Sequence, residues 1–557
     1  MRFLALLSLA VASGFVTVAA APTTQLPFFA PGRLHYDGIV PAPLHAQPAR
    51  QPIAGHFIVV LKAGVDAATV LAHRADVAAA QASSFDAAPG AGIRHVYDLE
   101  QRFQGYAGAF SDDVLAYIRA HPAVEYVEQD TVVSTTEMPH NNDQVWDVPY
   151  EQSIEEAFAV QGAPSLDLKT VEKGSPWGLV RISHREQVGF KNFGERARRA
   201  LRAPAPLTRS RAGQYVYNSK GGEGTVAYII DTGINIKHVE FEGRAIWGKT
   251  MPANDVDEDG NGHGTHCAGT IGSRKYGVAK KATLVAVKVL GSGGSGSMSD
   301  VTGGVLWAAN NATAITKEYS LNPHTAAAKK HKGFVANMSL GGGKSPSLDK
   351  AVNGAVDAGL HFAVAAGNEN ADACNTSPAG AENPVTVAAS TITDERAYFS
   401  NKGKCVDIAA PGLNILSTWN TGNTSTNTIS GTSMATPHIV GLLAYLLSVY
   451  GTPEFYEGQS ASVFADAAAS RSPLASVLNS LPLPSFATNF LDFLFGVQTE
   501  MTSLVAPIPK TPIGSVIAPS DLKKALQKLA TKDVLSDMTG TINLLSFNNA
   551  TDSTKNA

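Results

Sequence analysis

Three short segments hold side chains that could act together as a nucleophile, a base and an orienting acid. Asp231 ends the apolar run "YIIDTGI", His263 lies in "NGHGTHCAG", and Ser433 lies in "SGTSMATPH". A serine hydroxyl is a weak nucleophile that needs a base beside it, and the base needs a third group to hold its tautomer. Aspartate, histidine and serine supply those three roles, so these residue types indicate nucleophilic catalysis at Ser433.

Each segment also has a simpler interpretation. Asp231 could be a turn residue at the end of a strand, and Ser433 could be the N-cap of the apolar helix that follows it. His263, His266 and Cys267 stand within five positions, which suggests zinc ligands. A zinc site usually needs further ligands at matching spacing, and the sequence has none nearby. A zinc hydrolase that uses these three side chains is therefore an alternative.

The residues around Ser433 suit a nucleophile as well as a cap. Gly431 and Thr432 come directly before it, and glycine allows close approach of a backbone or a ligand. A helix that begins here would aim its backbone N–H groups at developing negative charge.

The part of the chain that holds these segments reads as an α/β domain. Near-continuous apolar runs predict a parallel sheet with helices on both faces. The functional crevice of such a sheet lies at the carboxyl ends of its strands. The first four runs each end in polar or glycine-rich residues, which would converge there. The predicted strands are "TVAYIIDTG", "TLVAVKVLG", "GFVANMSLGG", "HFAVAAGNEN" and "CVDIAAPG".

A smaller α+β domain precedes it, over residues 51–133. Its apolar patterns alternate between strand and helix in the order β-α-β-β-α-β, which is the ferredoxin-like arrangement. A polar, acidic segment follows at residues 134–175, and the larger domain is expected over residues 176–548.

The remaining segments predict export and two insertions. Residues 1–20 have the layout of a cleaved secretory signal peptide, with a retained anchor helix as the alternative, and the Pro- and Ala-rich residues 21–50 read as a linker. Insertions are expected at about 193–213, which is basic, and at about 455–516, whose apolar run is too short and interrupted to span a bilayer. The formal net charge of -4 gives no reason to expect a nucleic acid or an anionic membrane as partner.

The three segments that hold Asp231, His263 and Ser433, in that order along the chain, resemble the signature segments of the subtilisin-like serine proteases, the peptidase S8 family. "PWGLVRISHRE" and the cysteine of "GHGTHCAG" are most similar to the proteinase K and cerevisin-like group of fungal vacuolar proteinases B. The resemblance covers roughly Pro176 to Asn548 without the insertions. The first domain resembles the I9-type inhibitor propeptide of the same family.

The resemblance implies roles for individual residues. Asp231, His263 and Ser433 would form the catalytic triad, and the Asn368 amide would join the oxyanion hole. No cofactor is expected for catalysis. Structural calcium is common in the family, and Asp407 is a candidate ligand for it by resemblance, although one carboxylate makes a weak site and no metal site is predicted from it. The strands that pair with a substrate backbone would include Gly294, Ser295, Gly296, Ser339, Leu340 and Gly341.

In the secretory pathway, cysteines can form disulfides and sequons can carry glycans. The chain has three cysteines, so at least one thiol stays unpaired within the chain. Cys374 and Cys405 could pair, although sequence supplies neither distance nor geometry, and Cys267 is then the free thiol. Four sequons could carry glycans if exposed, at Asn311, Asn375, Asn423 and Asn549. A further sequon, at Asn337, lies in a predicted buried strand and is expected to stay unmodified.

The sequence thus predicts a monomeric serine endopeptidase made as a self-processing precursor. Its partners would be protein and peptide substrates and its own propeptide, and it would work in the vacuole lumen or outside the cell. We expect broad specificity that leans toward apolar or aromatic side chains, because no acidic cluster marks a pocket for basic residues. A catalytically silent relative that acts as a binding or inhibitor protein is the alternative from another class, and the presence of all three triad residues argues against it.

Overall fold

The computed structural model describes residues 40–46, 51–86, 88–100, 102–135, 169–187, 213–449 and 517–551. The expected signal peptide, most of the 134–175 segment and both expected insertions, apart from Gly213, lie outside these residues. The predicted linker at 21–50 is described only at 40–46.

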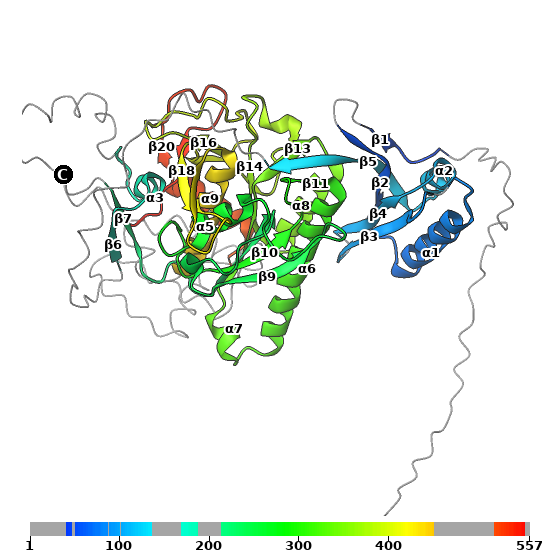
Figure 1. Cartoon of the computed structure of the whole chain (residues 1–557), viewed down its shortest axis with the longest axis horizontal. Helices are drawn as coiled ribbons and strands as arrows, with labels where there is room; N and C mark the ends of the chain where they lie inside the picture. The colour runs from blue at the N-terminus through cyan, green and yellow to red at the C-terminus, as the bar shows by residue number, and fades with distance from the viewer. Residues whose placement is uncertain are drawn as a thin grey trace, which may run out of the picture. The chain divides into compact units, whose positions relative to one another are not determined.

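The larger domain is built on a nine-stranded sheet (Figure 1). Neighbouring strands are parallel throughout, except for the edge pair β20 and β21. The predicted parallel α/β fold is confirmed. In spatial order the strands are β20 (Thr531–Lys532), β21 (Leu544–Leu545), β17 (Ile408–Pro411), β16 (Val385–Ser390), β14 (His361–Ala365), β12 (Gly333–Met338), β8 (Thr225–Asp231), β10 (Thr283–Lys288) and β9 (Ala245–Thr250).

Helices cover both faces of this sheet because its strands are apolar on both sides. In β8, Ala227 and Ile229 pack into the core with helices α5 and α9, whereas Tyr228 and Ile230 pack with α6 and α8. Successive strand residues point to opposite faces, so one strand serves two cores. The helices are α5 (His263–Gly272), α9 (Thr432–Val449), α6 (Met298–Leu321) and α8 (Pro346–Asp357).

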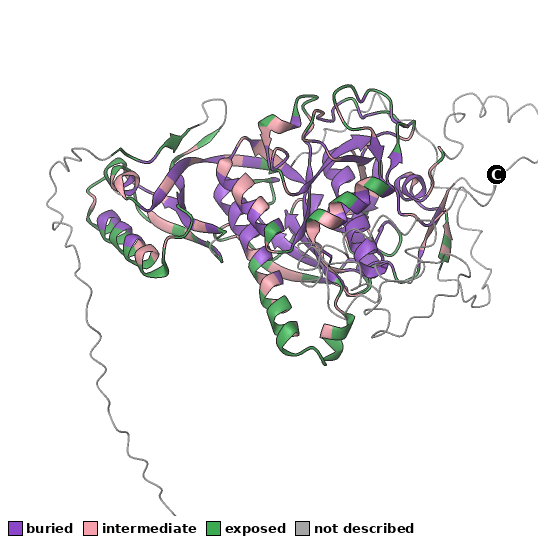
Figure 2. Cartoon of the chain, turned by 180° about the vertical axis from the view of Figure 1, so that it is seen from behind, coloured by how far each residue is buried: buried purple, intermediate pink, exposed green. Residues whose placement is uncertain are grey.

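Helix α9 is the central helix of the larger domain. By length and composition it is the one helix among the described residues that could cross a membrane, and all of its residues are buried inside the fold. By contrast, α7 (Ala326–Lys330) has no buried residue and, with the end of α6, is an exposed part of the domain (Figure 2).

Shorter elements complete the larger domain. A two-stranded ribbon forms from β18 and β19, a second one forms from β6 and β7, and α14 is the last helix. Their bounds are β6 (Lys169–Lys173), α3 (Trp177–Ile182), β7 (Gln214–Asn218), η3 (Val239–Phe241), η4 (Ala373–Asn375), β15 (Thr376–Ser377), β18 (Ile415–Thr418), β19 (Thr426–Ile429) and α14 (Pro519–Leu529).

The smaller domain has the predicted β-α-β-β-α-β order and its own buried core. Its sheet runs β5-β2-β4-β3, with both helices packed against it. A short strand, β1, pairs in parallel with β5, so residues predicted as linker form part of this sheet. Two residues cannot show a strand period, which is why the sequence pattern missed β1. The bounds are β1 (Leu44–His45), β2 (Pro52–Leu61), α1 (Ala67–Ser83), β3 (Gly92–Leu99), β4 (Phe103–Ala109), α2 (Asp112–Ala120) and β5 (Val124–Thr135).

Strand β5 joins the two domains. Beyond the small sheet it runs antiparallel between β11 (Ser295–Ser297) and β13 (Leu340–Gly343) of the larger domain (Figure 1). The run predicted as one strand, "GFVANMSLGG", therefore divides at Ser339. Strand β12 belongs to the core sheet, whereas β13 belongs to the sheet that includes β5.

Candidate active site

Asp231 and His263 meet at the carboxyl end of the parallel sheet. Asp231 is the last residue of β8, and His263 is the first residue of α5. Asp259 holds the turn before α5, because its carboxylate accepts the backbone N–H of Gly262 at 2.8 Å and that of Thr265 at 2.9 Å. Gly262 has a φ of +109°, and a Cβ there would lie 2.6 Å from the Trp419 ring, so glycine is required.

The two side chains form a buried ion pair. Nδ1 of His263 lies 2.8 Å from Oδ1 of Asp231, and both side chains are fully buried. Burial by itself lowers the pKa of His263, but the charge of Asp231 outweighs it and raises that pKa well above the usual imidazole value. Asp231 therefore favours a proton on this ring and fixes which nitrogen holds it.

Helix α9 brings Ser433 to this pair. Its hydroxyl donates to the carbonyl oxygen of Ser339 at 2.9 Å, and the Ser339 hydroxyl donates to the carbonyl oxygen of Ser433 at 2.9 Å. The Cys267 sulfur lies 4.0 Å from Nδ1 of His263 and 3.5 Å from the Ser433 carbonyl oxygen, so it packs between them. Ser433 is the second residue of α9, and its hydroxyl makes a tertiary contact, which differs from the N-cap interpretation.

The other ring nitrogen of His263 differs from Nδ1 in its bonding. Its Nε2 is buried, and no residue that the structure describes forms a hydrogen bond with it. This nitrogen is the atom that would receive a proton from a nucleophile. The Ser433 hydroxyl donates to the Ser339 carbonyl oxygen instead.

Asn368 follows β14 and is oriented by Thr432. Its Oδ1 accepts the backbone N–H and the hydroxyl of Thr432, both at 2.9 Å. The Thr432 hydroxyl in turn accepts the Gly367 backbone N–H at 3.2 Å. Because the Asn368 amide oxygen accepts both bonds from Thr432, these contacts fix which end of the amide is the acceptor and which is the donor. Thr432 is a positioning residue that the sequence reasoning missed, although it stands directly before Ser433.

Five of the six residues expected in the substrate strands contact the end of β5. The Gly294 carbonyl oxygen accepts the backbone N–H of Thr135 at 2.9 Å. On the same side, Ser295 and Gly296 pair with Ser134 and Val133. On the other side, Leu340 pairs with Thr135 and Gly341 pairs with Ser134.

Ser339 has a different role from its five neighbours. It lies between β12 and β13 rather than in a strand, and its hydroxyl and carbonyl both bond to Ser433. Ser339 directly precedes the strand residues Leu340 and Gly341, and position along the chain cannot show that its side chain and carbonyl turn to Ser433 instead.

The three residues proposed as zinc ligands do not form a common site. Burial lowers the pKa of His266 to about 3, and its Nε2 bonds to the Ile415 carbonyl oxygen at 2.9 Å. Asp231 instead joins His263 and Cys267, with ligand atoms within 4.8 Å of one another. Burial raises the pKa of the Cys267 thiol, whereas zinc binds the thiolate. This cluster therefore fits a hydrogen-bonded pair better than a metal.

Asp407 does not offer a free carboxylate to a metal. Its Oδ2 lies 2.8 Å from Nζ of Lys523 and accepts the backbone N–H of Thr386 at 2.8 Å. Burial raises the pKa of Asp407, while Lys523 lowers it. The candidate calcium ligand is thus paired with a cation from α14.

The cysteines and sequons occupy distinct environments. Cys374 and Cys405 form a disulfide, and Cys267 is a buried free thiol. Asn375 and Asn423 are exposed. Asn311 lies within α6, half-buried, and its amide oxygen accepts the Tyr228 hydroxyl at 2.7 Å. Asn337 is fully buried in β12.

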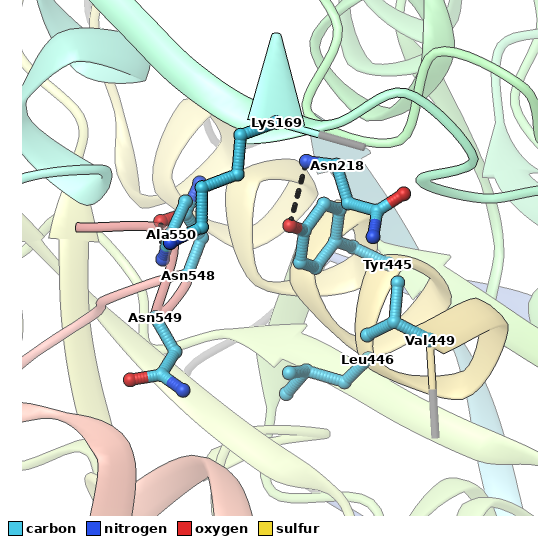
Figure 3. Close-up of a pocket in the computed structure, with 8 residues that line it drawn as sticks. All are labelled: Lys169, Asn218, Tyr445, Leu446, Val449, Asn548, Asn549 and Ala550. Carbon is cyan, nitrogen blue, oxygen red and sulfur yellow. Dashed lines mark hydrogen bonds between the residues drawn. The ribbon is translucent and has the colours of Figure 1, made fainter. Parts of the chain in front are cut away.

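A small pocket lies elsewhere, where α9 meets the ribbon of β6 and β7 (Figure 3). The half-buried sequon Asn549 is part of its wall, and the Tyr445 hydroxyl accepts the backbone N–H of Asn218 at 2.9 Å. No predicted catalytic residue lines it. The lining residues are Lys169, Asn218, Tyr445, Leu446, Val449, Asn548, Asn549 and Ala550.

Comparison with known families finds two matches that cover both domains. Residues 222–474 match the subtilase family of peptidases, and residues 56–136 match the peptidase inhibitor I9 family. The first match contains Asp231, His263, Asn368 and Ser433. The second ends one residue after β5.

Known proteins agree with these matches. The chain is 48% identical to the subtilisin-like serine protease Pen ch 18 of Penicillium rubens, over 78% of this chain and 77% of the relative. It is 49% identical to alkaline protease 2 of Aspergillus fumigatus, over 73% and 74%. A crystal structure of a cold adapted subtilisin-like serine proteinase is 36% identical, with a TM-score of 0.46, over 67% of this chain and 98% of that one. The chain therefore belongs to the subtilase family and is a subtilisin-like serine protease with an inhibitor I9 domain ahead of its peptidase domain.

Proposed function

We propose that this protease is a self-processing endopeptidase of the secretory pathway that cleaves peptide bonds through Asp231, His263 and Ser433. One observation carries the proposal. The end of β5 lies antiparallel between β11 and β13, and its last described residue, Thr135, pairs with Leu340, which follows Ser339, the residue that bonds to Ser433. A peptide held by backbone pairing on both sides is how an extended substrate would bind. We expect the processing site within residues 134–175.

The proposed reaction uses the groups around Ser433. His263 Nε2 takes the proton of the Ser433 hydroxyl as its oxygen attacks the scissile carbonyl carbon, and Asp231 stabilises the imidazolium. The Asn368 NH₂ group and the Ser433 backbone N–H hold the oxyanion. His263 then protonates the leaving amine, and water hydrolyses the acyl-enzyme with His263 again as base. The Ser433 hydroxyl must leave Ser339 for this step, which we expect to accompany substrate binding.

Inhibition by the propeptide is supported by contacts outside the cleft. Asp130 accepts the Ser299 backbone N–H at 3.0 Å and caps the start of α6, and Glu128 accepts that of Ser347 at 3.0 Å near the start of α8. His95 also bonds to Asp300 at 2.8 Å. Carboxylates at two helix N-termini meet partial positive charge, which favours a bound propeptide.

Specificity is expected to be broad and apolar-leaning. Backbone pairing makes little demand on sequence. Val133 of β5 is 1% exposed and belongs to the same buried cluster as Leu290 and Leu340, so the subsite that holds it is apolar. A monomer that works in the vacuole lumen or outside the cell, without a catalytic cofactor, is part of the proposal.

Ser433→Ala tests the mechanism directly. We expect this variant to accumulate as unprocessed precursor in a host that lacks related proteases. Ser430→Ala is a matched control, because its hydroxyl contacts Asn414 instead, and it should mature. Normal maturation of Ser433→Ala would contradict self-cleavage by this serine.

A second experiment separates the alternatives. Mature enzyme is treated with a serine-directed covalent inhibitor or with a chelator, and peptide hydrolysis is measured. We expect loss of activity with the inhibitor alone. Loss with the chelator alone would favour a zinc hydrolase, and no hydrolysis by the untreated, correctly processed protein would favour a silent relative.

A further inference from the structure

The side chain of Lys523, on helix α14, ends among three oxygen atoms of the peptidase domain. Its Nζ lies 2.8 Å from Oδ2 of Asp407, 2.7 Å from the carbonyl oxygen of Pro384 and 3.2 Å from that of Glu382. An ammonium group has three N–H donors and no acceptor, so these three oxygens match its full bonding capacity.

The same three oxygens form a ligand set of the kind that calcium binds. Calcium prefers carboxylate and backbone carbonyl oxygens. Glu382 and Pro384 lie just before β16, and Asp407 lies just before β17, so two neighbouring strands of the parallel sheet supply the set. The group that occupies it comes from a helix more than a hundred residues later in the chain.

We propose that Lys523 is a tethered cation, which fills the oxygen site of Asp407, Glu382 and Pro384 and excludes a calcium ion from it. A calcium ion bound to the same three oxygens would lie close to the Lys523 ammonium, and the two positive charges would repel each other strongly. The site is therefore satisfied from within the chain, and removal of the ammonium would open it to calcium.

The packing of α14 explains how Lys523 competes with a free ion. Leu522 and Leu526 on the same helix are buried in the main core of the peptidase domain. Gln527, one turn after Lys523, has its Nε2 3.3 Å from the Asp407 carbonyl oxygen and 3.4 Å from its Oδ1. The core contacts place the helix, so its ammonium is held at the site without a separate loss of translational freedom.

The site differs from an ordinary surface ion pair. The side chains of Lys523 and Asp407 are each 19% exposed, and two of the three ammonium contacts are to backbone carbonyls. Without a nearby cation, the largely buried Asp407 carboxylate would lack a charge partner, which is costly. Some cation is therefore required, and this chain provides its own.

Calcium binding to the full-length chain tests the proposal. All proteins carry Ser433→Ala, which prevents autolysis, and are stripped with EGTA before titration with calcium chloride by calorimetry. We expect Lys523→Ala to bind one more calcium equivalent than the Lys524→Ala control, in which an exposed neighbouring lysine is removed. A site with one carboxylate should have a dissociation constant on the order of 10⁻⁴–10⁻³ M.

Thermal unfolding gives an independent readout. Saturating calcium should raise the melting temperature of Lys523→Ala by about 2–4 °C more than that of Lys524→Ala. Adding Asp407→Asn to Lys523→Ala should abolish both the extra equivalent and the extra shift. Lys523→Met keeps the packing of the aliphatic stem, and circular dichroism verifies that each variant is folded.

Two results would overturn the proposal. One is that folded Lys523→Ala and Lys523→Met bind no more calcium than Lys524→Ala. The other is that Asp407→Asn alone costs the chain a calcium equivalent, because calcium would then already occupy the site beside Lys523. The Asp407→Asn measurement leaves Lys523 unchanged, so it can still contradict the proposal if α14 does not tolerate substitution. Neither readout depends on catalytic activity.

Discussion

His263 Nδ1 lies 2.8 Å from Asp231 Oδ1, although the two residues are 32 positions apart in the chain. The contact forms because β8 ends where α5 begins, at the carboxyl edge of the parallel sheet. Both side chains are fully buried, so the interaction is little screened by solvent. This pair sets the tautomer and the charge of the proposed base.

Asp231→Asn should leave the fold intact and lower the turnover number by about 10⁴-fold, because an amide can hold the wrong imidazole tautomer. Peptide hydrolysis by enzyme matured in trans measures the effect. Asp257→Asn replaces an exposed aspartate of the nearby loop and should change turnover little. A loss below tenfold in Asp231→Asn would contradict the role given to Asp231.

The activity should fall as the pH is lowered, because only neutral His263 can accept the Ser433 proton. Asp231 raises the pKa of His263 well above its usual value, so the acidic limb of kcat/KM should lie on the alkaline side of 6.5. Burial lowers the pKa of His263. Departure of the propeptide reduces that burial and so raises the pKa, which keeps the acidic limb on the alkaline side of 6.5. A pH–rate profile of the mature enzyme tests this, and a midpoint below 6.5 would contradict it.

Thr432→Val should reduce turnover about tenfold while KM changes little. The substitution removes the hydroxyl that bonds to Asn368 Oδ1 and leaves the backbone bond in place. Asn368→Ala should cost more, about the 10²- to 10³-fold known for this donor in subtilisin. Steady-state kinetics of both variants gives the comparison. Equal turnover in Thr432→Val and the unaltered enzyme would show that the backbone bond orients the amide alone.

Asp130→Ala should loosen the propeptide at the start of α6. The Ser299 backbone N–H and hydroxyl both lose their acceptor, which costs about 1–3 kcal/mol. Hydrogen exchange in the Ser433→Ala precursor should then show faster exchange of the Ser299 amide. Asp76→Ala changes an exposed aspartate of α1 and serves as the control. Unchanged protection of the Ser299 amide from exchange would show that Asp130 does not hold the propeptide at the start of α6.

Replacing Cys374 and Cys405 together by serine should lower the free energy of unfolding by about 3–4 kcal/mol, since the disulfide closes a loop with a sequence separation of 31. Urea unfolding of the Ser433→Ala precursor, where autolysis is absent, measures the change. Reduction of the unaltered disulfide should reproduce it. A change below 1 kcal/mol would mean that the loop is ordered without the bond.

Local sequence patterns predict much of the fold and the residue types that carry out the chemistry. Apolar runs such as that of β8 predict a sheet buried on both faces, because a strand covered on both sides has no polar alternation. The segments around Asp231, His263 and Ser433 are long enough to be recognised one by one. Strand β9, at the edge of the sheet, escaped prediction because it has one buried residue and no apolar run. Strand β16 is fully buried and was missed as well, although it is as long as β10 and β12.

Distances and directions were decided by tertiary structure alone. Only the folded chain shows that Ser339 turns toward Ser433, that Thr432 orients Asn368, and that Lys523 reaches Asp407. Residues separated by tens or hundreds of positions make each of these contacts. Hydrophobic periodicity along the sequence specifies which face of an element is buried, whereas the neighbour of a polar atom depends on how whole elements pack. The sequence by itself thus determined the kinds of groups at the site, and packing determined which atoms meet.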